Sequence, residues 1–377
     1  MTDQALVLVT SSFPIRGDGS EAAGSFVLDL VEELATHVDV RVVAPGHSAT
    51  REQWSESVTV HRYAAPSRPL STLKPWHPAD LHWIWRVWRG GLQATRDATA
   101  GGAVFILALW ALPCGAWARR VSRELGAAYS VWMLGSDVWS LGRLSVTRRM
   151  LRTVMRDARR RYADGLQLAR DSEAIGGLSV DFLPTTRTVS TRESPPPSAV
   201  PPYRFVFIGR WHRNKGIDLL LDALAILGDA DWECIAEIAI YGGGPLQALV
   251  HEKSRYLQDA GRPVVVGGFI PKAEAELAIM RANWVLIPSR IESIPVIFSD
   301  AVKLGRPVIA TPVGDLSQLV ATGCGIMCTS IDARAIASAV RVACHDTKER
   351  AASLAACAER FSLRNVVQQI LQGASGE

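Results

Sequence analysis

The opening of the chain, "ALVLVTSSFPIRGDGSEAAGSFVLDLVEELATHVDVRVVAP" at residues 5–45, decides the fold. Its two ends are short β-branched runs typical of buried strands, and the segment from residue 25 has the spacing of an amphipathic helix. A strand, a helix and another strand in this order build parallel sheets. Because the alternation returns along the chain, we expect an α/β protein with doubly wound sheets.

This first series of elements continues to about residue 169. We expect strands at residues 103–110, 127–134 and 165–169, a helix around Arg119 and an Arg-rich helix from 146 to 163.

A proline-rich stretch separates this series from another. Residues 193–202, "ESPPPSAVPP", have no periodicity, which is typical of a linker. We therefore expect an N-terminal domain at 1–193, a linker at 194–202 and a C-terminal domain at 203–357. The second series predicts strands at 203–210, 236–245, 263–269, 284–289 and 307–312, and helices at 216–227, 273–282 and from about 296.

The composition is that of a folded soluble chain, with 377 residues of which 48% are hydrophobic and 21% charged. Residues 100–118 carry no charge, but glycines and a proline interrupt them, so we expect a buried strand and a helix start instead of a membrane span. The six cysteines are scattered and predict reduced core thiols without a metal site. No signal peptide pattern opens the chain, so we expect a cytoplasmic protein.

Positive charge is concentrated in the first half. Residues 51–161 hold eighteen Lys and Arg against seven Asp and Glu, whereas residues 201–377 hold eighteen of each. Tryptophans alternate with arginines in residues 82–96, and residues 143–161 hold a second Arg cluster. These segments suit peripheral docking on the anionic inner face of a membrane. The alternative is a helix that packs its Trp face on the core; nucleic acid is not expected, because no RNA-binding motif accompanies the cluster.

Two cations follow the first strand of the second domain. Arg210 and Lys215 stand just past the strand end, and Gly209 and Gly216 allow the loop to turn sharply. Such cations suit a diphosphate, whose charge as a leaving group they would stabilise, although a solvated basic loop is the alternative. The stretch "YGGGP", which includes Gly244, suits a backbone that approaches a ligand, but it does not predict a dinucleotide site.

Two acids bound an apolar run, "ESIPVIFSD", which begins at Glu292 and ends at Asp300. We expect Pro295 in the first turn of a helix, with the amides of Ser293 and Ile294 at its N-terminus, where N–H groups and the helix dipole attract an anion. The two carboxylates would accept hydrogen bonds from hydroxyls. An anion flanked by two sets of hydroxyls describes a nucleotide sugar.

These motifs together resemble the retaining glycosyltransferases of the GT-B fold, of the group 1 or family 4 type. The similar stretches are "FIGRWHRNKGIDLLLDAL", "YGGGP", "VGGFIPKAEAEL" and "PSRIESIPVIFSDAVKLGRPVIATPVGD". More loosely, "LWALPCGAWA" looks like an "HW-LP-G" stretch and "WMLGSDVW" like an "HGSD" turn. The resemblance implies two Rossmann-like domains facing each other across a cleft, and a C-terminal helix at about 358–373 that returns to the first domain.

The resemblance also implies an activity: transfer of a sugar, without a metal ion or cofactor, from a nucleotide-diphosphate sugar to a saccharide, glycolipid or lipid-linked acceptor in polysaccharide biosynthesis of the cell envelope. It assigns Arg210 and Lys215 to the diphosphate. It assigns Glu292 to the transferred sugar and Asp300 to the ribose. Further donor contacts are implied at Gly19, Gly24, Gly209, Gly244, Ile270, Ser293, Ile294 and Pro295.

Two positions depart from the family pattern. Asp300 is one methylene shorter than the usual Glu, so a water would bridge it to the ribose or its helix would lie closer. Leu134 replaces the usual His, which leaves the departing phosphate oxygen to take the acceptor's proton, with Asp137 as the nearest other acid or as a helix cap. The alternatives are a catalytically silent nucleotide-sugar-binding partner of another transferase and a GT-B sugar-nucleotide epimerase.

Overall fold

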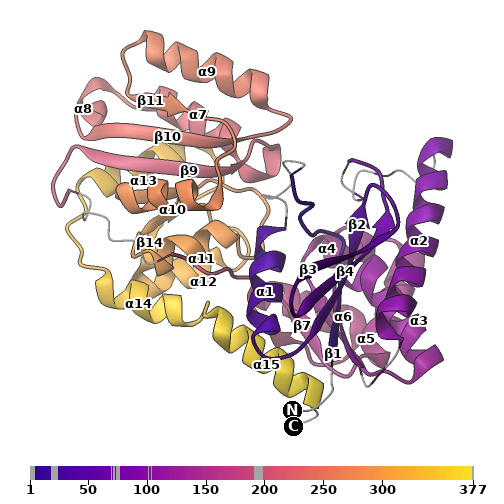
Figure 1. The fold of residues 1–377 in the computed structure, drawn as a ribbon. Helices are drawn as coiled ribbons and strands as arrows, with labels where there is room; N and C mark the ends of the chain where they lie inside the picture. Colours follow the sequence, from indigo (N-terminus) through magenta and orange to yellow (C-terminus); the bar gives the residue numbers. More distant parts are fainter. Residues whose placement is uncertain are drawn as a thin grey trace. The chain divides into compact units, whose positions relative to one another are not determined.

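A computed structural model of the chain describes residues 5–17, 24–68, 70, 73, 77–100, 102, 104–190 and 198–375 (Figure 1). The chain forms two compact units. The first unit holds Met1–Thr185 together with Leu363–Glu377, and the second unit holds Thr186–Ser362. The first unit thus ends at Thr185, before the boundary expected at residue 193, because Thr186 and Arg187 contact residues of the second unit. Residues 194–197 of the expected linker lie outside the described residues.

The first unit is built on an eight-stranded sheet with the order β3-β4-β2-β1-β5-β6-β7-β8. All neighbours pair in parallel except β3 and β4, which form an antiparallel hairpin that the sequence pattern did not predict. Its strands are β1 (Ala5–Val9), β2 (Val40–Gly46), β3 (Thr50–Ser55), β4 (Val58–Ala64), β5 (Val104–Leu109), β6 (Tyr129–Met133), β7 (Arg161–Ala163) and β8 (Asp181–Phe182).

Helices cover both faces of this sheet. On β1, Val7 and Val9 face the core formed with α2, α3, α5 and α6, whereas Leu6 and Leu8 face the core formed with α1 and α15. This alternation is the period-two pattern of a strand buried on both faces. The helices are α1 (Ser25–Ala35), α2 (Pro78–Thr99), α3 (Ala116–Leu125), α4 (Ser136–Trp139), α5 (Ser145–Asp157), α6 (Leu166–Gly176) and α15 (Leu363–Ser375). None of the described helices is long and apolar enough to cross a membrane.

Two expected elements of the first unit are corrected. The Arg-rich helix α5 ends at Asp157, before the strand β7, and does not continue to residue 163. Residues 166–169 are the start of the helix α6 and not a strand, and Gly165 is the N-cap of that helix. The apolar run is too short for its periodicity to distinguish the two, and the burial of Leu168 and Ser172 one turn apart favours the helix.

The second unit is built on a six-stranded sheet with the order β11-β10-β9-β12-β13-β14, in which all neighbours are parallel. The chain runs from β9 to one edge and then returns to β12 on the other side of β9. The switch point of the topology therefore lies between β9 and β12, where doubly wound sheets bind ligands. The strands are β9 (Tyr203–Arg210), β10 (Ile235–Gly243), β11 (Val264–Val266), β12 (Trp284–Ile287), β13 (Val308–Ala310) and β14 (Gly325–Met327).

Helices again pack on the sheet: α7, α9 and α13 share one core with β9 and β10, while α10 packs on β9 and α11 on β13. The helix α9 was not among the expected elements. The helices are α7 (Ile217–Ile226), α8 (Asp229–Trp232), α9 (Gln247–Asp259), α10 (Lys272–Arg281), α11 (Val296–Lys303), α12 (Leu316–Leu319), α13 (Ala333–Cys344) and α14 (Ala351–Glu359). The doubly wound α/β architecture expected for both halves is thus confirmed.

At the switch point, Gly216 brings the loop after β9 into contact with the loop after β12. It lies between β9 and α7 in the left-handed region, with φ of 70°, and a Cβ at this position would lie 1.8 Å from the carbonyl oxygen of Pro288, which follows β12. Only glycine allows this backbone approach. The loop after β9 is therefore in direct contact with the loop after β12.

We predict that Gly216→Ala destabilises the protein by about 2 kcal/mol more than Gly261→Ala, because overpacking adds to the cost of a left-handed backbone. Gly261 is a matched control, since its φ is 74° and nothing lies within 4 Å of the position of its Cβ. Urea unfolding of both variants measures the difference. Equal loss in the two variants would contradict the backbone contact.

Candidate functional site

Arg210 and Lys215 lie on the loop that follows β9. Arg210 is the last residue of that strand and is exposed, and its guanidinium has no hydrogen bond or ion pair within the described part of the chain. A 3-10 turn at Arg213–Lys215 then directs the chain into α7. The two cations predicted for a diphosphate therefore stand at the carboxyl end of β9, next to the switch point.

Arg290 fixes this loop to the loop after β12, a role that sequence reasoning missed. Its guanidinium donates to the carbonyl of Arg213 at 2.6 Å and to both carboxylate oxygens of Asp218 at 2.7 Å, and its backbone N–H donates to Asn214 at 2.7 Å. Burial alone would raise the pKa of Asp218, but the hydrogen bonds and charge of Arg290 bring that pKa below its usual value. The only sequence signal was an Arg within "PSRIES", next to the predicted acid.

Lys215 and Glu292 form an ion pair across the switch point. The Lys215 side chain is 36% exposed and that of Glu292 is 13% exposed, so the carboxylate is largely shielded while the ammonium reaches solvent. The hydroxyl of Ser289 donates to the same Glu292 oxygen at 3.4 Å. Two residues predicted to bind one ligand thus contact each other.

The segment after Glu292 leads into α11. Pro295 is the N-cap in extended conformation, one position before the helix and not in its first turn. Ser293 and Ile294 are buried, and the hydroxyl oxygen of Ser293 has no hydrogen-bond partner among the described atoms. The helix N-terminus with its orphan N–H groups therefore lies beside the Lys215–Glu292 pair.

Asp300 is more deeply buried than we expected. Its side chain is 0% exposed, and Arg187 donates to its Oδ2 at 2.7 Å, while its Oδ1 is buried without a partner. Burial raises the pKa of Asp300, and the Arg187 guanidinium opposes that shift. The shorter side chain of Asp keeps the carboxylate inside the unit, so a ribose contact would require Arg187 to give way.

The glycines at the end of β10 allow close packing of the backbone. A Cβ at Gly242 would lie 1.9 Å from the carbonyl oxygen of Gly209, and one at Gly244 would lie 2.8 Å from that of Trp211. These close approaches let the end of β10 pair with the loop after β9, which positions Arg210. "YGGGP" is thus accounted for by backbone packing within the unit.

An aromatic side chain that we had not singled out lies at the same edge. Phe269 is 70% exposed, and a Cβ at Gly243 would lie 2.6 Å from its ring. The neighbouring Ile270, predicted to lie near a base, is half-buried and lines a cavity of about 290 Å³ with Tyr241 and Glu274. The exposed ring of Phe269 lies against Gly243, which has no side chain, and so presents a flat apolar surface.

The remaining candidates belong to the first unit. The Asp137 carboxylate accepts hydrogen bonds from the backbone N–H groups of Ala111 at 2.7 Å, Val138 at 3.1 Å and Leu134 at 3.3 Å. Burial outweighs these donors and raises the pKa of Asp137 to about 6. These contacts hold the loop after β5 against the start of α4. Asp137 is not the helix cap that was the alternative for this acid, because Gly135 is the N-cap of α4 and the helix has no side-chain cap hydrogen bond.

Two glycines were expected near the diphosphate. Gly24 is the N-cap of α1, with φ of 80°, and a Cβ there would lie 2.6 Å from the hydroxyl of Ser12. Gly19 lies outside the described residues.

We predict that Arg187→Ala destabilises the second unit by about 3–5 kcal/mol, because it leaves a buried carboxylate unpaired. Arg204→Ala is the control. The guanidinium of Arg204 lies 3.3 Å from the carboxylate of Glu237, whose side chain is 35% exposed, and such a surface pair contributes only about 0–1 kcal/mol to stability. Asp300→Asn should restore part of the stability of Arg187→Ala. Denaturant unfolding that ranks the two Arg variants as equal would contradict this account.

Comparisons with known proteins find matches to the second unit. Residues 202–346 match the family described as glycosyl transferases group 1. A D-inositol 3-phosphate glycosyltransferase of Jonesia denitrificans is 35% identical over 42% of this chain and 38% of its own. A putative teichuronic acid biosynthesis glycosyltransferase of Bacillus subtilis is 27% identical over 36% of this chain. The chain spans only 31–41% of the length of the first curated relatives it matches.

Solved structures extend the likeness over the whole chain. Sucrose-phosphate synthase from Thermosynechococcus elongatus is similar with a TM-score of 0.72 at 18% identity, and the match covers 98% of each chain. Such low identity establishes the fold alone. Residues 202–346 thus match the glycosyl transferases group 1 family, and the two doubly wound units of the chain have the GT-B fold.

Proposed function

We propose that the protein is a retaining glycosyltransferase that moves a sugar from a nucleotide-diphosphate sugar to a saccharide, glycolipid or lipid-linked acceptor, without a metal ion. The observation that carries this proposal is the Lys215–Glu292 ion pair at the switch point of the second unit. It joins a cation suited to phosphate and a shielded carboxylate suited to hydroxyls beside a helix N-terminus.

Three features of this edge have complementary roles in the proposal. The exposed guanidinium of Arg210 and the ammonium of Lys215 stabilise the negative charge of the departing diphosphate. The orphan N–H groups before α11 add partial positive charge at the same place. The surface of Phe269 against Gly243 suits a stacked base, next to Ile270. A UDP-type donor is supported by the Anabaena protein HepE, similar at a TM-score of 0.68 and described in complex with UDP and UDP-glucose.

The transfer follows from these roles. The bond between the anomeric carbon and the diphosphate oxygen breaks, and the acceptor oxygen bonds to the same face of that carbon. The acceptor's proton passes to the departing phosphate oxygen. The side chain of Leu134 has no group that can accept a proton, and the Asp137 carboxylate already accepts hydrogen bonds from backbone N–H groups. Glu292 holds the sugar hydroxyls during the transfer.

The surface of α2 supports peripheral membrane docking as a further part of the proposal. Trp85 is 55% exposed, and the guanidinium of Arg89 lies 4.8 Å from the centre of its ring. Arg86 stacks on Trp83 in the same way at 5.1 Å. Trp85 does not pack on the core, as the alternative of a buried Trp face would require. Aromatic rings and cations that are presented together suit anionic headgroups.

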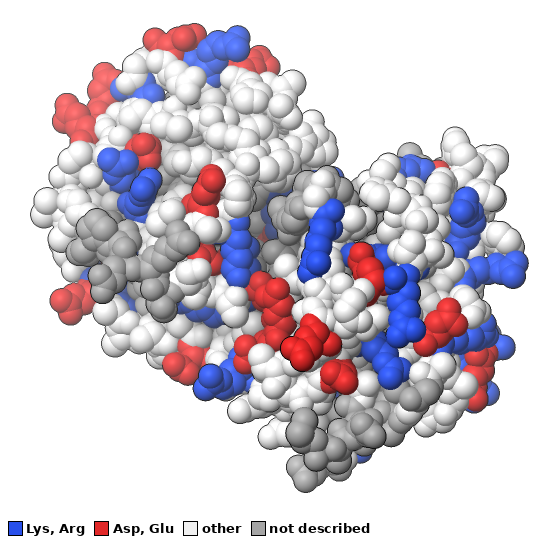
Figure 2. All heavy atoms as spheres, viewed as in Figure 1, with Lys and Arg blue, Asp and Glu red and all other residues white. Residues whose placement is uncertain are grey.

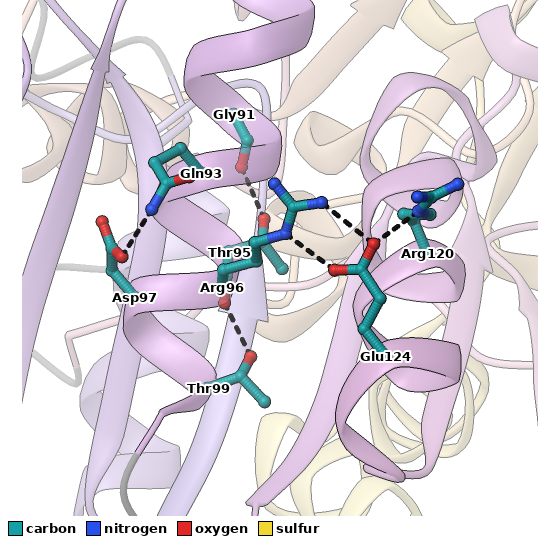
Figure 3. A network of polar contacts seen from close by, with 8 residues as sticks. All are labelled: Gly91, Gln93, Thr95, Arg96, Asp97, Thr99, Arg120 and Glu124. Atoms are coloured by element: carbon teal, nitrogen blue, oxygen red, sulfur yellow. Dashed lines mark hydrogen bonds and ion pairs between the residues drawn. The ribbon is translucent and has the colours of Figure 1, made fainter.

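Not every arginine of this region is available to a membrane. Arg96 of α2 donates to both oxygens of Glu124 of α3, at 2.7 and 2.9 Å, and Arg120 donates to the same carboxylate at 2.5 Å (Figure 3). These hydrogen bonds lower the pKa of Glu124 to about 2. Figure 2 accordingly shows acidic side chains among the basic ones on the side that carries α2 and α3. The docking surface is therefore the part of α2 before Arg96.

We predict that Glu292→Gln lowers transfer by about 100-fold or more while UDP still raises the melting temperature, since the variant loses a contact made to the reacting sugar. Glu252→Gln, at an exposed position on α9, is the control and should keep full activity. A panel of sugar nucleotides assayed for donor hydrolysis measures both. Wild-type turnover in Glu292→Gln would refute the assignment, and a native chain that binds UDP without any turnover would indicate a silent partner.

We predict that the protein floats with phosphatidylglycerol vesicles at low salt and that Trp85→Ala reduces the bound fraction several-fold, because the ring no longer enters the interface. Tyr256→Ala is the control: this aromatic side chain is 72% exposed but lies on α9 of the second unit. Flotation that is equal for the two variants, or absent in the wild type, would rule out this surface.

A further inference from the structure

The first unit contains a cavity of about 830 Å³ at the carboxyl ends of its strands. The segments that follow β1, β2, β4, β5 and β6 all line it. The chain leaves β1 for β2 on one side and later reaches β5 on the other, so this is the switch point of the first sheet.

Apolar side chains dominate the described lining of this cavity. The larger ones include Phe13, Ile15, Leu70, Trp110, Leu112 and Leu141. The polar side chains among them are mainly serine hydroxyls, as in Ser12, Ser136 and Ser140. A cavity of this kind offers hydrogen bonds to uncharged hydroxyls and burial to an apolar group.

Trp110 is held in the lining by a strained backbone. It is the one non-glycine residue with positive φ in the described part of the chain, at 67°. A bulky side chain in that conformation is costly, and such strain is retained mainly at functional sites. The ring is fixed at the cavity by contact with Phe26, at 6.5 Å between ring centres.

Each charged or titratable group among the described lining residues already has a partner, His47 included. The one Arg among the described lining residues, Arg68, forms an ion pair with Asp80, whose side chain is only 6% exposed. Asp137 accepts hydrogen bonds from three backbone N–H groups. Among the described lining residues, a phosphate group would lose water without gaining an uncommitted cation, which disfavours it.

We propose that this cavity binds the acceptor and selects an uncharged glycoside with an alkyl or aryl aglycone over a phosphorylated one. This inference rests on the proposed transferase function and narrows its acceptor. It separates this chain from the curated relatives named for D-inositol 3-phosphate, whose substrate carries a phosphate. The serine hydroxyls hold the sugar, and the leucine and tryptophan side chains cover the aglycone.

The test measures binding to the full chain by ligand-detected NMR, with octyl β-glucoside below its micelle concentration, methyl β-glucoside and D-inositol 3-phosphate as probes. We expect the octyl glucoside to bind about tenfold or more tightly than the methyl glucoside, because its chain is buried. D-Inositol 3-phosphate at equal concentration should not displace it. Binding independent of the alkyl chain, or displacement by D-inositol 3-phosphate, would overturn the proposal.

Two variants locate the binding. Leu141→Arg should weaken octyl glucoside about tenfold, which corresponds to the loss of one partly buried apolar contact. Leu125→Arg is the control, because Leu125 is 53% exposed at the end of α3 and does not line the cavity. Equal affinity in the two variants would place the octyl group elsewhere and reject the assignment.

UDP binding in the same samples separates this inference from the proposed function. An unfolding midpoint equal to that of Leu125→Arg shows that the first unit of Leu141→Arg is folded, because UDP binding reports on the second unit alone. A chain that binds UDP and turns over a donor, but shows no preference for octyl glucoside, refutes the cavity assignment alone. A chain that binds octyl glucoside and no nucleotide refutes the transferase and keeps the cavity.

Discussion

The contact between the backbone of Gly216 and the carbonyl of Pro288 is the constraint on which the second unit's candidate site depends. It brings two loops that are far apart in sequence to the same edge of the sheet. The ion pair of Lys215 and Glu292, and the clamp of Arg290 on Asp218, both span this junction. A site built in this way is preorganised, because the scaffold and not the ligand holds the charges in position.

The charges of the protein divide into those that hold the structure and those that remain available. Arg290, Arg187 and Arg96 each pair with a carboxylate, and each joins two segments distant in sequence. Arg210 has no such partner among the described residues and stands in solvent. The same division leaves no uncommitted cation among the described residues that line the cavity of the first unit, and this limits which acceptors the cavity suits.

The sequence predicted the parts of the fold that depend on local pattern. The β-branched runs and the glycines gave both doubly wound sheets, and "ESIPVIFSD" led to Glu292 at the start of α11. It did not predict that Arg187 covers Asp300, because this contact joins residues 113 positions apart and no periodicity reports it. The helix α6 was mistaken for a strand because a short apolar run fits either element.

The placement of α15 has a consequence for the order in which the protein folds. Leu363, Val366, Val367 and Ile370 complete a core that is shared with α1 and with strands of the sheet, β1, β2 and β5 among them. The second unit is continuous in sequence and can fold as soon as it leaves the ribosome. The first unit is synthesised earlier, yet one side of its sheet, which α1 covers in part, is not fully covered until α15 emerges. The part of the chain that is made first is therefore the part that is finished last.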